Sequence, residues 1–174
     1  MINAFLKKVK KHIIAESTNL SATNYAKRIF NVKAADDIDN GKLVNLDDMK
    51  WVENEYFTMV EPTATSRVGL ILSVADGTDE TPFAATLESN FYNGKDEIMR
   101  VYDLQEGDKF TISDYGVTPA TSGGTVAVGS YVKADGYDIV ESTTKPTGAF
   151  YGEIVEKINR TNGTFFKILV RQNG

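Results

Sequence analysis

Residues 149–170 read AFYGEIVEKINRTNGTFFKILV and hold the clearest fold signal in the chain. Two runs rich in β-branched and aromatic residues, 149–158 and 164–170, flank Asn159-Arg160-Thr161-Asn162-Gly163. Asn-Gly between two such runs is a strong short-range signal for a β-hairpin, because both residue types tolerate positive φ. The stretch therefore predicts two antiparallel strands joined by a tight turn.

The same kind of pattern recurs upstream. Residues 68–75 form a nearly continuous apolar run that suits a buried strand, and residues 98–104 alternate between apolar and polar. A second hairpin is indicated where residues 125–132 meet residues 137–140 across Lys133-Ala134-Asp135-Gly136. Short strands with turn signals at intervals of about 8–12 residues are typical of sandwiches and barrels. We therefore predict a mainly β protein, built as an antiparallel β-barrel or β-sandwich.

Composition narrows the class of protein. The chain has 174 residues, 41% of them hydrophobic, which suits one domain with a real core. It has no Cys, so disulfides and thiolate metal sites are excluded. No apolar run approaches the roughly 20 residues that span a bilayer, and no secretory signal peptide is evident. We expect a protein made in the cytoplasm without an anchor of its own.

Charge is divided unevenly along the chain. Residues 1–33 carry seven basic side chains against Glu16 alone, a net charge of +6. The remaining residues carry 12 basic and 23 acidic side chains, a net charge of −11. Such asymmetry indicates that the two parts have different roles. The acidic body disfavours nucleic acid as a partner.

The N-terminal part is predicted to be a short amphipathic helix over residues 3–15, followed by an extended polar linker or arm over 17–35. Apolar side chains share one stripe of this helix, and lysines lie across from it. The stripe predicts packing against the protein's own domain, docking on a partner subunit, or binding at a membrane surface. We divide the chain into a basic helix and arm, 1–35, and a β-rich body, 36–174. Partner contacts are predicted from Phe5, Leu6, Lys7, Val9, Lys10, Ile13, Tyr25 and Phe30.

No catalytic or metal site is predicted. The one histidine, His12, lies among lysines, and we expect it to be a solvated surface residue. An EF-hand register starting at Asp36 places Gly41 correctly, but Ile38 offers no oxygen at the third position. We therefore expect an acidic turn in which Asn40-Gly41 supplies positive φ, with an irregular Ca²⁺ site as the alternative. No residue is assigned a catalytic role, and no cofactor is expected.

A family resemblance covers about residues 36–132. It rests on Gly41-Lys42-Leu43-Val44, a link containing Pro62, the strand Gly69-Leu70-Ile71-Leu72, and then Met99-Arg100-Val101-Tyr102-Asp103-Leu104 and Glu106-Gly107-Asp108-Lys109-Phe110. This arrangement resembles the head decoration (auxiliary capsid) proteins of tailed bacteriophages. The resemblance implies a small β-rich virion component on the capsid surface, without cofactor or catalysis.

The expected function is therefore that of a non-enzymatic virion structural protein, which decorates or cements the capsid through protein–protein contacts. Its expected partners are the major capsid protein or other virion subunits, with a homo-oligomer and without nucleic acid or membrane. The alternative is a carbohydrate- or cell-surface-binding module of a phage tail or fibre. Trp51, with Tyr56 and Phe57 nearby, would then be a platform on which a sugar ring stacks.

Overall fold

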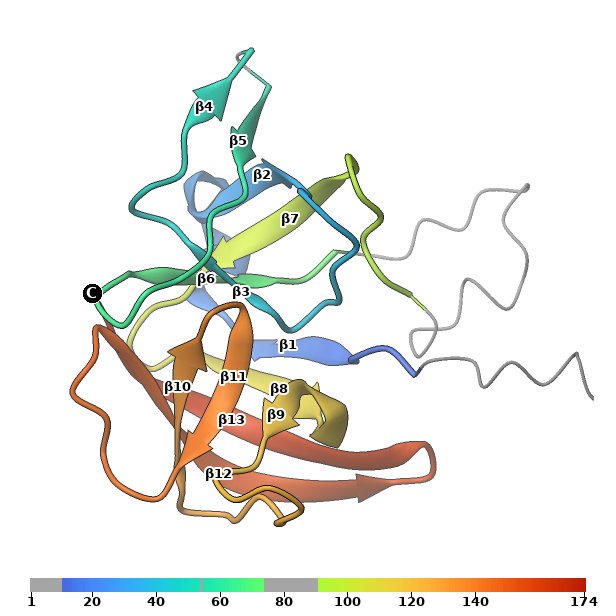
Figure 1. Cartoon of the computed structure of the whole chain (residues 1–174), viewed down its shortest axis with the longest axis vertical. Helices are drawn as coiled ribbons and strands as arrows, with labels where there is room; N and C mark the ends of the chain where they lie inside the picture. The colour runs from blue at the N-terminus through green and yellow to red at the C-terminus, as the bar shows by residue number, and fades with distance from the viewer. Residues whose placement is uncertain (1–10, 54, 74–90) are drawn as a thin grey trace, which may run out of the picture.

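The computed structural model describes residues 11–53, 55–73 and 91–174. In this part of the chain two β-sheets make up nearly all the regular structure, and one of them is curled into a half-barrel (Figure 1). The predicted mainly β architecture is confirmed. The helical segments described are single 3₁₀ turns: η1 (Ser21–Asn24), η2 (Ala26–Arg28) and η5 (Asp114–Gly116).

The larger sheet has seven strands, and most of its neighbours are antiparallel. The short edge strand β9 pairs in parallel with β11. The last strand in the sequence, β13, lies inside the sheet between β8 and β12. In spatial order the strands are β1 (Ala15–Asn19), β8 (Lys109–Ser113), β13 (Gly163–Asn173), β12 (Phe150–Arg160), β10 (Tyr131–Asp135), β11 (Asp138–Ser142) and β9 (Val117–Thr118).

The smaller sheet has six strands. Its central strands pair antiparallel, and β2 pairs in parallel with β5. The hairpin of β4 and β5 ends this sheet and stands at the top of the view in Figure 1. In spatial order the strands are β3 (Leu43–Asn45), β6 (Val68–Ile71), β7 (Ile98–Asp103), β2 (Ile29–Lys33), β5 (Tyr56–Thr58) and β4 (Trp51–Val52).

Two hydrophobic cores follow from the alternation of side chains along the strands. Leu43 and Leu70 of the smaller sheet pack with Phe110 and other side chains of the larger sheet. Their sequence neighbours Val44 and Ile71 point the other way, into a second core. The smaller sheet therefore buries both faces, which is why the apolar run starting at Val68 is continuous rather than alternating.

The C-terminal hairpin forms as predicted. Arg160 pairs with Gly163, so Thr161 and Asn162 make a two-residue turn. Gly163 has φ 146°, a conformation that L side chains rarely adopt. Two irregularities in the register, after Tyr151 and after Ile154, mark β-bulges that bend these long strands.

The second hairpin also forms, but its turn is shifted. Asp135 pairs with Asp138, which places the turn at Gly136-Tyr137 rather than across residues 133–136. Gly136 has φ 57° and supplies the left-handed conformation that the turn requires. The strand β10 begins only at Tyr131, so most of the predicted strand 125–132 is loop.

The N-terminal prediction is wrong where the structure describes it. Residues 11–14 are not helical and Ala15 begins β1, while the first part of the predicted helix lies outside the described residues. Ile13 and Ile14 are both buried, and neighbouring residues cannot share the narrow apolar stripe of a surface helix. Pairing of β1 with β8 decides the local structure here, because tertiary contacts override a weak local propensity.

The predicted arm over residues 17–35 is likewise part of the body. β1 is the edge strand of the larger sheet and β2 lies inside the smaller sheet. Leu20 and Ala22, between them, are buried. A boundary at residue 35 therefore does not separate an arm from the β-rich body among the described residues.

Candidate partner-binding surface

Three aromatic side chains form a continuous row across neighbouring strands of the smaller sheet. Trp51 on β4 is opposite Phe57 on β5, with ring centroids 4.5 Å apart and planes at 62°. Phe57 meets Phe30 of β2 at 5.5 Å and 89°. Edge-to-face contacts of this kind favour one relative orientation of the rings. We call Trp51, Phe57 and Phe30 the aromatic ridge.

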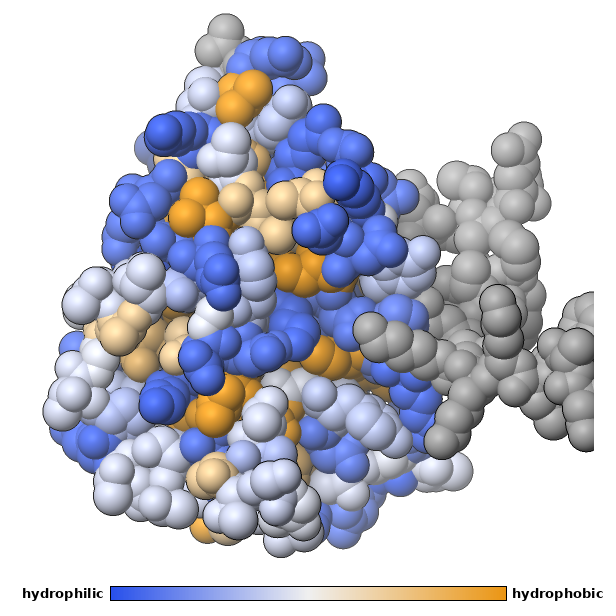
Figure 2. All heavy atoms as spheres, viewed as in Figure 1, coloured by the Kyte–Doolittle hydropathy of each residue, from blue (hydrophilic) through white to orange (hydrophobic). Residues whose placement is uncertain are grey.

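The ridge runs from solvent into the second core. Trp51 is 51% exposed, whereas Phe57 and Phe30 are half-buried and pack against core residues. Figure 2 shows apolar side chains reaching the surface over the β4–β5 hairpin among hydrophilic neighbours. Because the inner rings are fixed by the core, the outer ring loses little conformational freedom when a partner covers it.

Local hydrogen bonds hold the hairpin that carries Trp51. The Lys50 amide donates to the Thr58 hydroxyl at 3.0 Å, and the Thr58 amide donates to the Lys50 carbonyl at 2.9 Å. Glu53, just after β4, has φ 51°, a left-handed conformation uncommon outside glycine. β4 is only two residues long, which limits edge-to-edge pairing with another sheet. The edge therefore offers a side chain rather than a long row of backbone groups.

Charged groups lie on the other face of the same strands, since Lys33 is one residue from Val32, which pairs with Phe57. Lys33 Nζ is 3.2 Å from Asp96 Oδ1 and 5.6 Å from the ring centroid of Tyr56. The hydrogen bond to Asp96 and the charge of that carboxylate raise the pKa of Lys33.

The structure separates the predicted partner-contact residues. Phe5, Leu6, Lys7, Val9 and Lys10 lie outside the described residues. Ile13 is buried in the first core at 4% exposure, so it packs on its own domain. The remaining two predicted contacts stay at or near the surface: Tyr25 and Phe30.

Tyr25 is the most exposed large hydrophobic side chain among the described residues, at 62%. The guanidinium carbon of Arg28 lies 5.9 Å from its ring centroid. Residues 24–28 line a shallow depression of about 400 Å³. Tyr25 lies between η1 and η2, whereas Trp51 and Phe57 of the ridge lie on β4 and β5.

Sequence reasoning did not place Trp51 and Phe57 among the partner contacts, although it considered Trp51 as a sugar platform. The sequence feature that could have indicated a contact between Trp51 and Phe57 is their placement on two neighbouring segments. Trp51 and Phe57 sit on two short strand-like segments separated by a few polar residues. Cross-strand aromatic pairs are common units of sheet stabilisation. Which of the two rings would face solvent could not be read from that spacing.

The prediction for His12 is wrong. Its side chain is only 15% exposed, and Nδ1 lies 2.5 Å from Oδ1 of Asp39. Its ring stacks on Tyr92 with centroids 4.9 Å apart and planes at 22°. These partners come from distant parts of the sequence, so the surrounding lysines gave no hint of them. His12 fixes the entry to β1 against the segment that precedes β3.

The acidic cluster at 36–39 runs from a bend into a β-bridge between Ile38 and Asn93, the turn lies at Asn40-Gly41, and the carboxylates diverge. Asp39 pairs with His12, Asp37 accepts the Lys95 amide at 2.9 Å, and Asp36 lies 3.8 Å from Lys95 Nζ. Within the described ranges no three His, Asp or Glu side chains come together as metal ligands. Gly41 has the expected positive φ, 80°, and a Cβ there would lie 2.8 Å from the Ile112 side chain.

Two buried carboxylates hold loops in place. Glu141, 6% exposed, accepts the backbone amides of Ala127 at 2.9 Å and Ala120 at 3.1 Å. Burial acts to raise the pKa of Glu141, but these two hydrogen bonds and one from Ser130 outweigh it and lower the pKa. Asp108, 4% exposed, bonds the Ser21 amide and ties η1 to the turn before β8. Both acids therefore have structural partners.

No family model, curated protein or solved structure matches this chain. The resemblance to phage head decoration proteins, and the expectation that the protein is not an enzyme, therefore stay predictions. In the part of the chain that the structure describes, no helix has the length and apolar character needed to cross a bilayer.

Proposed function

We propose that the protein is a structural component of a tailed-phage particle, and that it attaches to other virion subunits through the aromatic ridge. The observation that carries this proposal is the half-exposed Trp51, held by two inner aromatic rings at the end of a projecting hairpin. Aromatic anchors of this kind dominate the energetics of protein interfaces. The family resemblance in the sequence supplies the context of a virion.

The energy available at the ridge follows from its exposure. A Trp side chain buries about 150–250 Å² when fully covered, and Trp51 retains about half of its surface. Covering the remaining area, about 100 Å² at roughly 25 cal/mol per Å², would contribute about 2–3 kcal/mol. That is the size of an interface hot spot, and many copies on one particle would add to it.

The test is co-sedimentation with heads of the phage whose genome carries this reading frame. We expect the wild-type protein to bind and Trp51→Ala to bind roughly 30-fold or more weakly, which corresponds to about 2 kcal/mol. Tyr115→Ala is the matched control, because Tyr115 is 55% exposed but belongs to the larger-sheet side of the molecule. Equal head binding by the Trp51 variant would refute the assignment of the ridge.

The alternative is a carbohydrate-binding module, favoured by the same exposed indole, since an accessible ring face is what sugar stacking requires. It predicts binding on a glycan array that is lost in Trp51→Ala and retained in Tyr115→Ala. Glycan binding together with no affinity for heads would replace the structural function with this one.

A further inference from the structure

Asn-Gly pairs are the chemically labile points of this chain. Such a pair deamidates faster than other Asn-containing pairs, because no Cβ on the glycine blocks the approach of its amide nitrogen to the Asn side chain. The reaction still requires that both groups can move toward each other. The sequence holds four such pairs: Asn40-Gly41, Asn93-Gly94, Asn162-Gly163 and Asn173-Gly174.

In three of the pairs, hydrogen bonds hold the Asn side chain in place. Asn40 Nδ2 donates to the Ser73 carbonyl at 2.8 Å, and Asn40 Oδ1 accepts the Ser73 amide at 2.9 Å. Asn93 is 3% exposed, and its Nδ2 donates to the Ile38 carbonyl at 3.1 Å. Asn173 makes three bonds to backbone groups, at 2.7, 2.8 and 2.8 Å. None of these carboxamides can turn toward its glycine without breaking hydrogen bonds.

The glycine amide is engaged in the same three pairs. Deamidation requires the amide nitrogen to lose its proton before it attacks, and a proton that is already donated to a nearby acceptor is harder for a solvent base to remove. These pairs are therefore protected at both reacting groups. The acceptors are the Ile71 carbonyl for Gly41 at 2.9 Å, Glu97 Oε2 for Gly94 at 2.7 Å and the Ala149 carbonyl for Gly174 at 3.0 Å.

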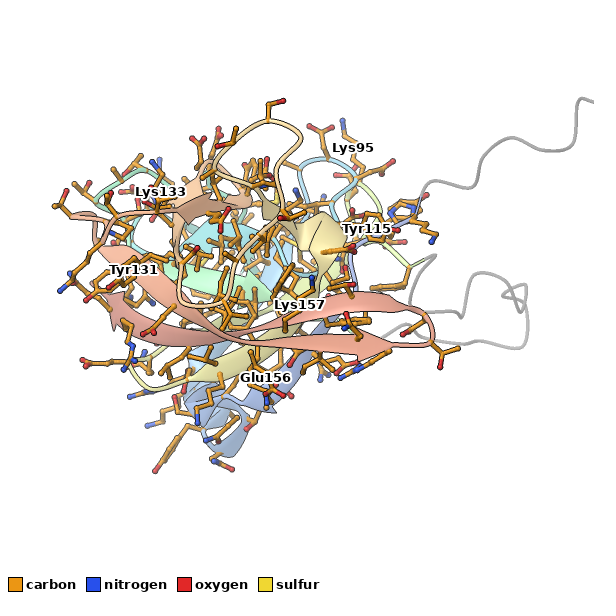
Figure 3. The ribbon with its side chains drawn as sticks, turned by 90° about the horizontal axis from the view of Figure 1, so that it is seen from below. Lys95, Tyr115, Tyr131, Lys133, Glu156 and Lys157 are labelled. Atoms are coloured by element: carbon orange, nitrogen blue, oxygen red, sulfur yellow. The ribbon has the colours of Figure 1, made fainter. Side chains whose placement is uncertain are left out.

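Asn162 is held differently. It is exposed in the two-residue turn between β12 and β13, and its side chain forms no hydrogen bond with any residue that the structure describes. Figure 3 shows the long β12–β13 hairpin crossing the view, with its turn at the right-hand end, beyond Glu156 and Lys157. Gly163 pairs with Arg160 in the last rung before the turn, and a rung at the end of a hairpin opens more readily than one over the core. The two reacting groups can therefore meet here without unfolding of the sheet.

We propose that Asn162 is a site of spontaneous deamidation in the folded protein. The Gly163 amide nitrogen gives up its proton to a solvent base and bonds to Cγ of Asn162. The bond from Cγ to the side-chain nitrogen breaks, and that nitrogen takes up a proton from solvent and leaves as ammonia. Water then opens the resulting succinimide ring at either carbonyl, which gives an aspartyl or an isoaspartyl residue. The net reaction consumes water and releases ammonia, and it needs no oxidant or cofactor.

The reaction changes both charge and shape at the end of the hairpin. Arg160 donates to the two carboxylate oxygens of Glu16 at 2.5 and 2.9 Å, which connects this end of the hairpin to β1. A new carboxylate at position 162 competes for the same guanidinium. The isoaspartyl product also adds a methylene to the main chain of the turn. No residue of the aromatic ridge takes part, so the modification does not depend on the function proposed above.

Peptide mass mapping compares the four pairs within one sample. Trypsin cleaves after Lys and Arg, so each pair falls in a peptide of its own: 34–42, 68–95, 161–167 and 172–174. The folded full-length protein is incubated at mildly alkaline pH and digested briefly, and conversion of amide to acid is measured by mass. We expect peptide 161–167 to convert at least about tenfold faster than the other three, because reaction in those requires local opening. Equal rates, or faster conversion in another peptide, would overturn the proposal.

Two controls separate the effect of the fold from that of the sequence. In denaturing urea, conversion at Asn40 and Asn93 should come within about threefold of that at Asn162, because their protecting contacts are lost. A tenfold contrast that persists in urea would refute the structural basis. Isoelectric focusing of the aged folded protein should show an acidic form in wild type and in Asn159→Gln, an exposed Asn of the same hairpin, but not in Asn162→Gln. Equal accumulation of that form in Asn162→Gln would also overturn the proposal.

Discussion

Replacement of Asp108 by alanine should loosen the whole N-terminal part of the body. The Asp108 carboxylate accepts the amides of Ser21 and Gln105, both at 2.8 Å, and the Ser21 hydroxyl at 3.3 Å. It is 4% exposed, so water cannot readily replace it in Asp108→Ala. Two charge-assisted bonds to amides, at about 1.5 kcal/mol each, give an expected loss of about 3 kcal/mol in the free energy of unfolding.

The assay is urea denaturation followed by far-UV circular dichroism. Glu106→Ala is the matched control: it removes an exposed carboxylate from the same turn and should change stability by less than about 0.5 kcal/mol. Asp108→Asn, with one acceptor oxygen, should fall between wild type and the alanine variant. Amide exchange at Ser21 should quicken in step with the loss. A loss for Asp108→Ala within about 0.5 kcal/mol of the control would refute the idea that this side chain anchors residues 20–24.

Three further perturbations have signs fixed by the structure. Burial raises the pKa of Asp103, whose Oδ1 has no hydrogen-bond partner among the described residues, so Asp103→Asn should gain up to about 1 kcal/mol at pH 7. A raised native pKa favours folding at low pH, so that gain should vanish below the ordinary value of 3.8. Glu141→Gln should lower the free energy of unfolding by about 1–2 kcal/mol at pH 7. Because the native pKa of Glu141 is lowered, this loss should shrink as the pH falls through and below 4.5. A difference from wild type that stays constant with pH would contradict this prediction. Gly116→Ala places a Cβ 2.3 Å from Cδ1 of Ile112 and should cost about 1–3 kcal/mol in thermal or urea unfolding, partly recovered by adding Ile112→Val.

The sequence predicted the strands and turns whose signals are local. Asn162-Gly163 and Asn40-Gly41 determine turns that involve only residues next to them in sequence. The continuous apolar run that starts at Val68 indicates a strand buried on both faces. The order of strands in the sheets was not predictable in this way. β8 follows β7 after a short turn, yet the two strands belong to different sheets, and the partners that decide this lie far along the chain.

The N-terminal part shows why the rest could not be predicted. Apolar residues at every third or fourth position are compatible with an amphipathic helix. In the structure, however, the adjacent side chains of Ile13 and Ile14 are both buried, just before β1 begins. The partners of His12, Asp39 and Tyr92, are 27 and 80 residues away. Side chains that become buried through such remote contacts look solvated when only their neighbours are considered.

The central position of β13 in the larger sheet limits which strands can pair while the chain is still being synthesised. Of the seven strands of the larger sheet, β13 is synthesised last, yet β8 and β12 pair with it from both sides. The Asn173 side-chain amide then donates to the carbonyls of Val68 and Leu104, which joins the end of this strand to the smaller sheet. Strand pairings between residues so far apart in sequence form slowly, because the entropy of closing a long loop is lost before the contacts stabilise the sheet. The larger sheet therefore cannot be completed before β13 has been synthesised, and until then apolar side chains of β8 and β12 lack their partners, which favours chaperone binding and aggregation.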